Sequence, residues 1–192
     1  MFRLSMLVFA AVLFGGIAAN ATSYEAVSFD DLVTRADVIF IGEVTDVRPF
    51  PLETPDGAII KTRVIFRVSD SLWGTTSLLE VFDFLGGEWG DRELVVDGMP
   101  KFAVGDRRVV FASRERSINP IVGFTQGLLQ IRRDGGGVDR VFTLGGVALG
   151  RPESIGAAAP AVPLAPITPI SPLSLSEFRD RISRALAEIR RQ

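Results

Sequence analysis

The sequence predicts an all-β fold, a closed antiparallel barrel or sandwich of about five to seven strands, with one helix before the strands and one after them. Short apolar-rich runs recur along the chain, and turns rich in glycine, proline and aspartate separate them, as in all-β domains. A helical period appears only near the two ends of this strand-rich stretch. The 192 residues suffice for one domain with a full hydrophobic core.

Residues 1–21 are predicted to be a signal peptide. Arg3 precedes an apolar run from Leu4 to about Ala18, and Ala19-Asn20-Ala21 places small residues where signal peptidase cuts, before Thr22. The alternative is an uncleaved membrane anchor, but about 15 residues are short against the roughly 20 that span a bilayer. We therefore expect export to the periplasm or the medium, with no stable membrane span after cleavage.

The first predicted elements after the signal are a helix and a strand. Ser28–Ala36 reads as a short helix, with Ser28 as its N-cap and an acidic residue three positions later. Val38–Val47 follows as a strand that begins apolar on both faces, which requires a covering element outside the sheet. We expect the strand to bend at Gly42, and Arg48–Gly57, with three prolines, to be a loop.

The central hairpin is predicted within Thr62–Gly87. Its first strand alternates between an apolar face and a face with two arginines, which is the period of a half-buried strand. A turn at residues 73–76 leads to the next strand, Leu78–Leu85. Gly86–Asp91 is predicted to be a loop. The later strands are expected at Arg92–Val96, Asp106–Ala112, Ile121–Arg133 and Val138–Leu144, the last two joined by the glycine-rich turn 134–137.

These predictions place a barrel domain at residues 22–146, a linker rich in proline and alanine at 147–172, and a helix at 173–192. Ser174 and Glu177 have the spacing of a capping box at the start of this helix. Its apolar stripe consists of Phe178, Ile182, Ala185, Leu186 and Ile189. We expect the stripe to dock on the doubly apolar start of the first strand.

Composition excludes several classes of function. The chain has no cysteine and no histidine, which removes disulfides, thiolate nucleophiles, the commonest general base and the commonest zinc ligands. The formal net charge is -2, with no concentrated basic face of the kind that nucleic-acid binding requires. Asp134 and Asp139 bracket glycines but match no calcium loop, and turn chemistry accounts for them. We expect no metal and no cofactor.

Five residues are candidate interaction residues. Glu88 and Asp91 flank Trp89, an aromatic side chain that could stack on a sugar, and Trp73 is the second tryptophan of the chain. The competing interpretation is a solvated loop with a partly buried tryptophan. Gln126 is expected on an apolar strand face, where its amide needs hydrogen-bond partners, either in a cross-strand bond or in a ligand contact.

Several stretches, in order and spacing, resemble exported bacterial domains similar to the netrin and tissue-inhibitor-of-metalloproteinase (NTR/TIMP-like) module. They are Ala36–Val44, Thr62 with Phe66–Val68, Leu72–Gly74, Gly86-Gly87, Gly98–Phe102 with Gly105-Asp106, and Ile121–Gly123 with Gln126-Gly127. The resemblance implies an OB-like Greek-key barrel with helices packed outside. Some similar domains accompany matrixin-type metalloproteases, and animal relatives inhibit such enzymes through a cysteine-led N-terminus. This chain has no cysteine for that mechanism and no histidine for a zinc-protease motif.

The expected function is therefore a non-enzymatic, exported interaction module that binds a protein partner, such as a secreted or envelope protease, through loops including Gly86–Asp91. The alternative is a polysaccharide-binding module centred on Trp89 and Trp73, with Glu88 and Asp91 nearby. A hydrolase that uses carboxylates alone is a third class, since paired acids across a cleft can cleave glycosides.

Overall fold

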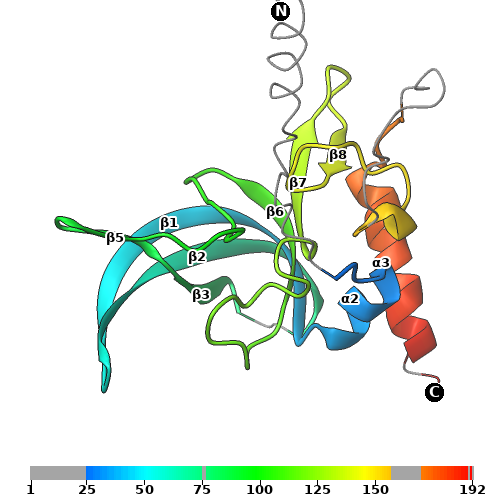
Figure 1. Ribbon diagram of the computed structural model, residues 1–192. Helices are drawn as coiled ribbons and strands as arrows, with labels where there is room; N and C mark the ends of the chain where they lie inside the picture. The colour runs from blue at the N-terminus through cyan, green and yellow to red at the C-terminus, as the bar shows by residue number, and fades with distance from the viewer. Residues whose placement is uncertain (1–24, 75–76, 157–169, 190, 192) are drawn as a thin grey trace, which may run out of the picture.

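The computed structural model describes residues 25–74, 77–156, 170–189 and 191, and Figure 1 shows their arrangement. The predicted signal peptide and residues 157–169 of the predicted linker lie outside the described residues. None of the helices in the described part is long and apolar enough to cross a membrane.

The described chain is mostly antiparallel β-sheet. Six strands form one sheet in the order β3-β2-β1-β6-β7-β8, and β4 and β5 form a separate two-stranded ribbon. Every pairing between these strands is antiparallel. The elements are α2 (Phe29–Arg35), β1 (Val38–Thr54), β2 (Gly57–Trp73), β3 (Leu79–Leu85), β4 (Gly87–Trp89), β5 (Arg92–Leu94), β6 (Arg107–Ala112), β7 (Leu128–Arg133), β8 (Asp139–Phe142), the 3-10 turn η2 (Pro152–Ser154) and α3 (Leu175–Ile189).

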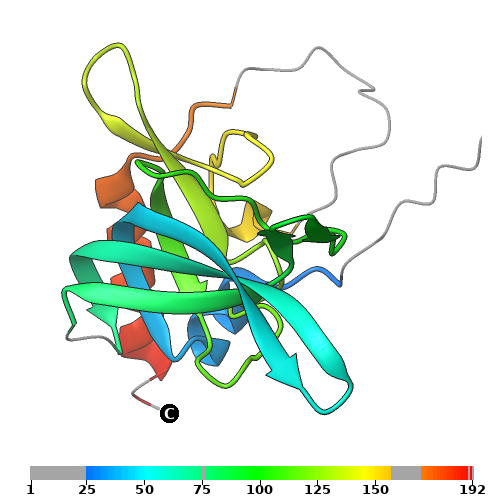
Figure 2. The same cartoon turned by 90° about the vertical axis from the view of Figure 1, so that its left-hand side faces the viewer.

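Strands β1 and β2 are much longer than the sequence predicts. They pair from Ile39↔Trp73 to Thr54↔Gly57, so the predicted proline loop is instead the far end of a long curved hairpin (Figure 2). Only Val38–Glu43 of β1 also pair with β6. Pro49 and Pro51 therefore pair with β2 on one side and with no strand of the described residues on the other. Such an edge position tolerates a residue without an N–H. A register shift lies at Ile41/Gly42, where the sequence predicts the bend.

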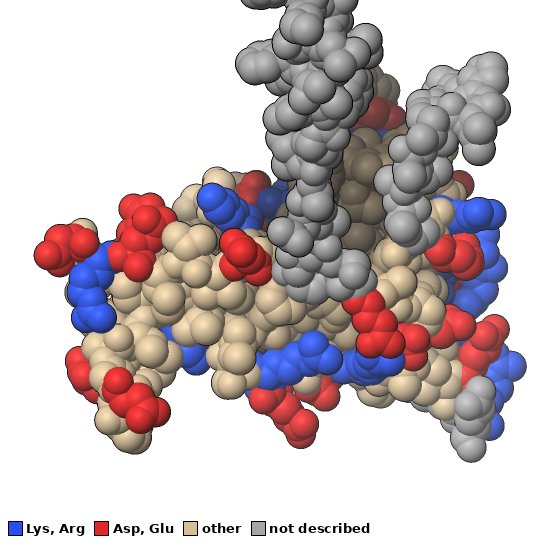
Figure 3. Space-filling model, viewed as in Figure 1, with Lys and Arg blue, Asp and Glu red and all other residues tan. Residues whose placement is uncertain are grey.

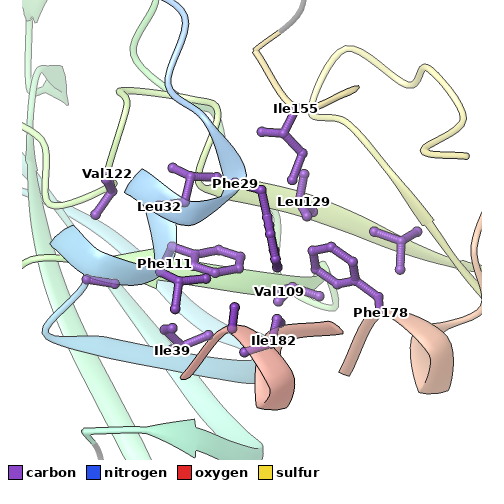
Figure 4. Packing of buried hydrophobic residues seen from close by; sticks show 14 of the residues in the cluster. Phe29, Leu32, Ile39, Val109, Phe111, Val122, Leu129, Ile155, Phe178 and Ile182 are labelled. Atoms are coloured by element: carbon purple, nitrogen blue, oxygen red, sulfur yellow. The ribbon is translucent and has the colours of Figure 1, made fainter. Parts of the chain in front are cut away.

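The first five residues of β1 and most of β6 are buried on both faces, which explains their continuous apolar runs. Phe40 and Val110 belong to a core cluster inside the curve of the sheet. Ile39 and Phe111 belong to the other cluster, between the sheet and the helices (Figure 4). The sheet is thus an apolar layer shared by two cores.

Both described helices begin at the serine caps that the sequence predicts. Ser28 Oγ accepts a hydrogen bond from Asp31 N at 3.1 Å. At α3, Ser174 Oγ accepts from Glu177 N at 3.2 Å, and Ser174 N donates to Glu177 Oε2 at 2.8 Å, which completes the capping box.

The apolar stripe of α3 covers the doubly apolar start of β1, as predicted. Phe178 and Ile182 are fully buried in the same cluster as Ile39, and Phe29 of α2 packs against Phe178 with ring centroids 5.8 Å apart (Figure 4).

Two further segments differ from the sequence-based prediction. Residues 122–127 form turns, with Phe124 at φ 67°, so β7 begins at Leu128 and not at Ile121. Residues 147–156 of the predicted linker pack on the core, because Leu149 and Ile155 fill the helix-side cluster and Leu149 N bonds to Val141 O at 3.1 Å. Prolines prevent regular ladders but do not prevent burial of the apolar residues between them.

Candidate binding groove beside the β4–β5 ribbon

The predicted loop 86–91 is a β-ribbon whose start depends on two glycines. Gly86 and Gly87 have φ values of 104° and 134°, which side-chain-bearing residues rarely adopt. A Cβ at Gly86 would lie 2.8 Å from Leu94 O, and a Cβ at Gly87 would overlap Thr62 Oγ1. The chain can therefore fold sharply out of β3 and lay β4 back against the sheet.

Hydrogen bonds hold this ribbon to β2. Gly86 N donates to Ile60 O at 2.8 Å, and Thr62 Oγ1 donates to Gly86 O at 2.7 Å. On the other ribbon strand, Arg92 Nη2 donates to Ala58 O at 3.2 Å. The sequence interpretation of Gly86–Asp91 as a loop was wrong because these contacts join residues far apart in the chain.

A groove of about 420 Å³ lies between the ribbon, the segment that follows it and the inner face of the sheet. We call it the ribbon groove. The apolar side chains that line it come from β1, from β3 and from the segment after β5, and include Val47, Pro49, Phe84, Val95, Val96, Met99 and Phe102.

The floor of the ribbon groove is aromatic. Phe84 is buried, and its ring centroid lies 4.8 Å from that of the half-buried Phe102. Phe102 also meets Phe66 edge to face at 5.8 Å. Met99 packs against the same cluster. A rigid apolar floor of this kind can bury an apolar side chain of a ligand, whereas few polar groups are available to orient one.

The rim of the groove carries charges that lack partners among the described residues. Glu88 and Glu93 face each other across the ribbon, and both are exposed. Like charges directly opposite are unfavourable in a sheet. Lys101 also lines the groove. Acidic side chains gather at the ribbon end of the molecule in Figure 3.

The predicted site residues are only partly brought together. Glu88 lines the groove, whereas Trp89 and Asp91 lie on the same ribbon, exposed, without lining it. Trp73 ends β2 away from the ribbon and packs, partly buried, against the helix-side core. The two tryptophans therefore do not form one surface, which removes the pairing expected for a sugar platform.

Gln126 lies in the turn before β7 and not on a strand face. Its Oε1 accepts from Val27 N at 2.8 Å, and its Nε2 donates to Glu25 O at 2.9 Å and to Gly123 O at 3.2 Å. The amide thus finds the structural partners that its half-buried position requires, but they hold the N-terminal segment 25–27 and no neighbouring strand.

Sequence reasoning missed the apolar lining of the groove. Val95 is 69 % exposed beside the half-buried Val96, and Met99 and Phe102 lie in a segment without regular structure. The available signal was this run of large apolar residues in a stretch with turn residues, which neither a strand nor a helix period explains.

The charged side chains that line the groove are Glu88, Glu93 and Lys101. Among the described residues, no group of three or more acidic side chains is placed to hold a metal ion. Comparison of the chain with protein-family models, with curated proteins and with solved structures finds no match.

Proposed function

We propose that this chain is a non-enzymatic, exported interaction module that binds an apolar segment of a protein partner in the ribbon groove. The observation that carries the proposal is the aromatic floor formed by the buried Phe84 and the half-buried Phe102, which line the groove together with exposed apolar residues such as Val95. Buried apolar and aromatic anchors supply most of the energy in protein recognition. A secreted or envelope protease is one class of partner within this proposal.

A polysaccharide is the less favoured ligand. Sugars are held by many hydrogen bonds together with aromatic stacking, and the groove is mostly apolar, with only Thr62, Glu88, Glu93 and Lys101 as polar lining side chains. Trp89 is 48 % exposed on the ribbon but does not line the groove. These features favour a polypeptide segment over a glycan.

The finer fold belongs to the same proposal. We propose an OB-like, NTR-like barrel, supported by the strand order β3-β2-β1-β6-β7 and by the bond of 2.9 Å from Leu85 N, at the end of β3, to Ile118 O, which precedes β7. OB barrels are partly open and bind ligands with one sheet face and its loops. The ribbon groove lies on such a face.

The test compares two matched variants of the full chain. Val95→Asp places a charge in the groove wall, and Val104→Asp places one at a site of similar exposure, 67 %, that does not line the groove. Each tagged chain is expressed with its own signal and used to capture proteins from the envelope and the medium. Any protein retained by wild type is then purified and titrated against all three chains.

Binding that Val95→Asp weakens at least about tenfold and Val104→Asp leaves unchanged would support the proposal, since a desolvated charge costs more than 1.4 kcal/mol. Equal binding by both variants would contradict the groove as the site. If the chain captures a glycan in place of a protein, and Trp89→Ala abolishes that binding, the result would support the polysaccharide-binding function instead.

A further inference from the structure

Strand β3 has one edge that no other strand of the described residues covers. It ends the sheet order, and its register on β2 runs without a shift from Lys61↔Leu85 to Arg67↔Leu79. Val68 N bonds to Leu78 O at 2.9 Å at one end of this pairing, and Gly86 N bonds to Ile60 O at 2.8 Å at the other. Hydrogen-bonded pairs alternate along an antiparallel ladder, so residues 79, 81, 83 and 85 direct their backbone groups away from β2.

The two ends of this outward-facing row are already bonded. Ser77 Oγ donates to Leu79 O at 2.6 Å and accepts from Leu79 N at 3.2 Å. Leu85 N donates to Ile118 O at 2.9 Å. Between these two bonded ends, the N–H and C=O of Val81 and Asp83 make no backbone bond to another described residue. This leaves a short stretch of strand edge as a template on which another strand can pair.

A hollow of about 240 Å³ runs beside this template. One wall is Val81 to Asp83, and the other is formed by residues 113–120, the segment between β6 and β7. We call this space the β3 slot. It is distinct from the ribbon groove, with which it shares no lining residue.

Cations predominate in the β3 slot. Asp83 is neutralised by Arg63, whose Nε and Nη2 donate to its two carboxylate oxygens at 2.8 and 2.9 Å. Lys61 Nζ donates to the neutral carbonyl of Ser117, so its charge has no acidic partner there. Arg116 is exposed and makes no ion pair within the described part of the chain. Carboxylates are the groups that complement two such cations.

The slot fits one narrow chain better than a second copy of the molecule. The bond from Leu85 to Ile118 places residues 113–120 against one end of the β3 edge, so a second β3 would meet this segment before pairing along its length. Only the backbone groups of Val81 and Asp83 remain free to pair with a second copy. Their contact area is far smaller than a stable dimer requires.

We propose that the β3 slot binds an extended, acidic polypeptide segment, which adds to β3 as an extra strand through the backbone of Val81 and Asp83. Main-chain hydrogen bonds then supply affinity, and Lys61 and Arg116 select carboxylate side chains. This proposal does not depend on the function proposed for the ribbon groove.

The probe is a terminally blocked peptide of four Val-Glu repeats, titrated against the full chain. Two control peptides are four Val-Lys repeats and the Val-Glu peptide with every backbone amide N-methylated, which keeps the side chains and removes the donors. We expect the Val-Glu peptide to bind, to protect the Val81 and Asp83 amides from hydrogen exchange, and to bind at least about tenfold more tightly than either control.

Two variants test the site. Val81→Pro removes an N–H that points away from β2, and Val81→Ala truncates the same side chain while keeping that N–H. We expect Val81→Pro to weaken peptide binding about tenfold relative to Val81→Ala. Arg116→Glu, at an exposed position, is expected to weaken Val-Glu binding and to strengthen Val-Lys binding, and it tests the proposal even where Val81→Pro fails to fold.

Several results would overturn the proposal. They are equal binding of the N-methylated peptide, equal binding by the two Val81 variants when both are folded, and amides at Val81 and Asp83 that are already protected in the free protein. A dimer in sedimentation that Val81→Pro dissociates would assign the edge to a second copy of the chain. Val95→Asp in the ribbon groove should leave peptide binding unchanged, so failure of one proposal is distinguishable from failure of the other.

Discussion

Glu80 of β3 accepts a hydrogen bond of 2.9 Å from Nη2 of Arg114, and its side chain is only 3 % exposed. The carboxylate lies on the buried side of the strand, whereas the neighbouring residues in the chain, Leu79 and Val81, have exposed side chains. A buried charge requires a partner, and Arg114 supplies one from the segment after β6. This pair ties that segment to β3 at Glu80, and Arg114 also lines the β3 slot.

Loss of this pair should lower stability. Arg114→Ala removes one partner of a buried carboxylate, and we expect the free energy of unfolding to fall by about 2 kcal/mol, less than for a fully buried pair because Arg114 is half exposed. Urea denaturation measures the change. Glu80→Gln in the Arg114→Ala background should recover part of the loss, since it removes the buried charge. Arg116→Ala, close by and exposed, is the control, and an equal effect of both arginines would contradict the assignment.

The docking of α3 should contribute strongly to the core. Phe178→Ala is expected to cost about 3–4 kcal/mol, because Phe178 is fully buried among Phe29 and Phe111. Ile189→Ala lies on the same stripe at 37 % exposure and should cost less than about 1 kcal/mol. Deletion of residues 173–192 should destabilise the sheet cooperatively. A thermal unfolding curve that Phe178→Ala leaves unchanged would show that the helix does not contribute to the cooperative core.

Asp139 should make stability depend on pH in the acidic range. Arg107 donates two hydrogen bonds to its carboxylate, at 2.9 and 2.7 Å, and this lowers the pKa of Asp139 against the opposing effect of burial. Because the folded pKa lies below the unfolded value of about 3.9, the contribution is present above about pH 4 and is lost as the pH falls through the folded pKa.

The matched variant is Asp139→Asn. At pH 7 we expect it to reduce the free energy of unfolding by about 1–2 kcal/mol, since it loses charge-assisted hydrogen bonds to a partly exposed arginine. This loss of stability relative to wild type should disappear as the pH falls through the folded pKa of Asp139, below which both side chains are neutral. Asp91→Asn, on the exposed ribbon, is the control variant for the removal of a carboxylate. A difference for Asp139→Asn that is the same at every pH would contradict the ion pair as its source.

Gln126 should anchor the segment before α2. Gln126→Ala removes the acceptor for Val27 N and the donors to two carbonyl groups, and we expect a loss of about 1–2 kcal/mol with faster hydrogen exchange of the Val27 amide. Gln126→Glu keeps an acceptor for Val27 and should be intermediate. An unchanged exchange rate for Val27 in Gln126→Ala would assign the order of this segment to packing alone.

Local sequence signals determined the parts of the fold that depend on residues close in the chain. The capping box of Ser174 and Glu177 requires only its own four residues, and the β7–β8 turn requires only Asp134 and Gly137, whose N donates to Asp134 O at 3.0 Å. The alternation in β2 likewise reports burial on one face of a single strand. These elements were predictable because neighbouring side chains and backbone groups satisfy one another.

The candidate sites were decided by tertiary contacts. Pro49 reads as a loop residue, yet it sits in β1 because β6 leaves that part of the strand at an edge. The ribbon exists because Gly87 can approach Thr62, which is a contact between strands that no local period encodes. The sequence suggests one sugar-binding surface for Trp89 and Trp73 only because both are tryptophans. In the structure, the length of β2 separates them.

The sequence by itself therefore determined the strand-rich class, the caps, the alternating faces and the absence of cysteine and histidine chemistry. Only the tertiary structure decided where the sheet stays open, how the ribbon folds back, and which apolar and charged side chains share the ribbon groove or the β3 slot. The physical reason is the distance along the chain between the groups that contact one another. Caps and turns are satisfied within a few residues, whereas a groove or a free edge depends on which distant segments pack together and which backbone groups they leave unpaired.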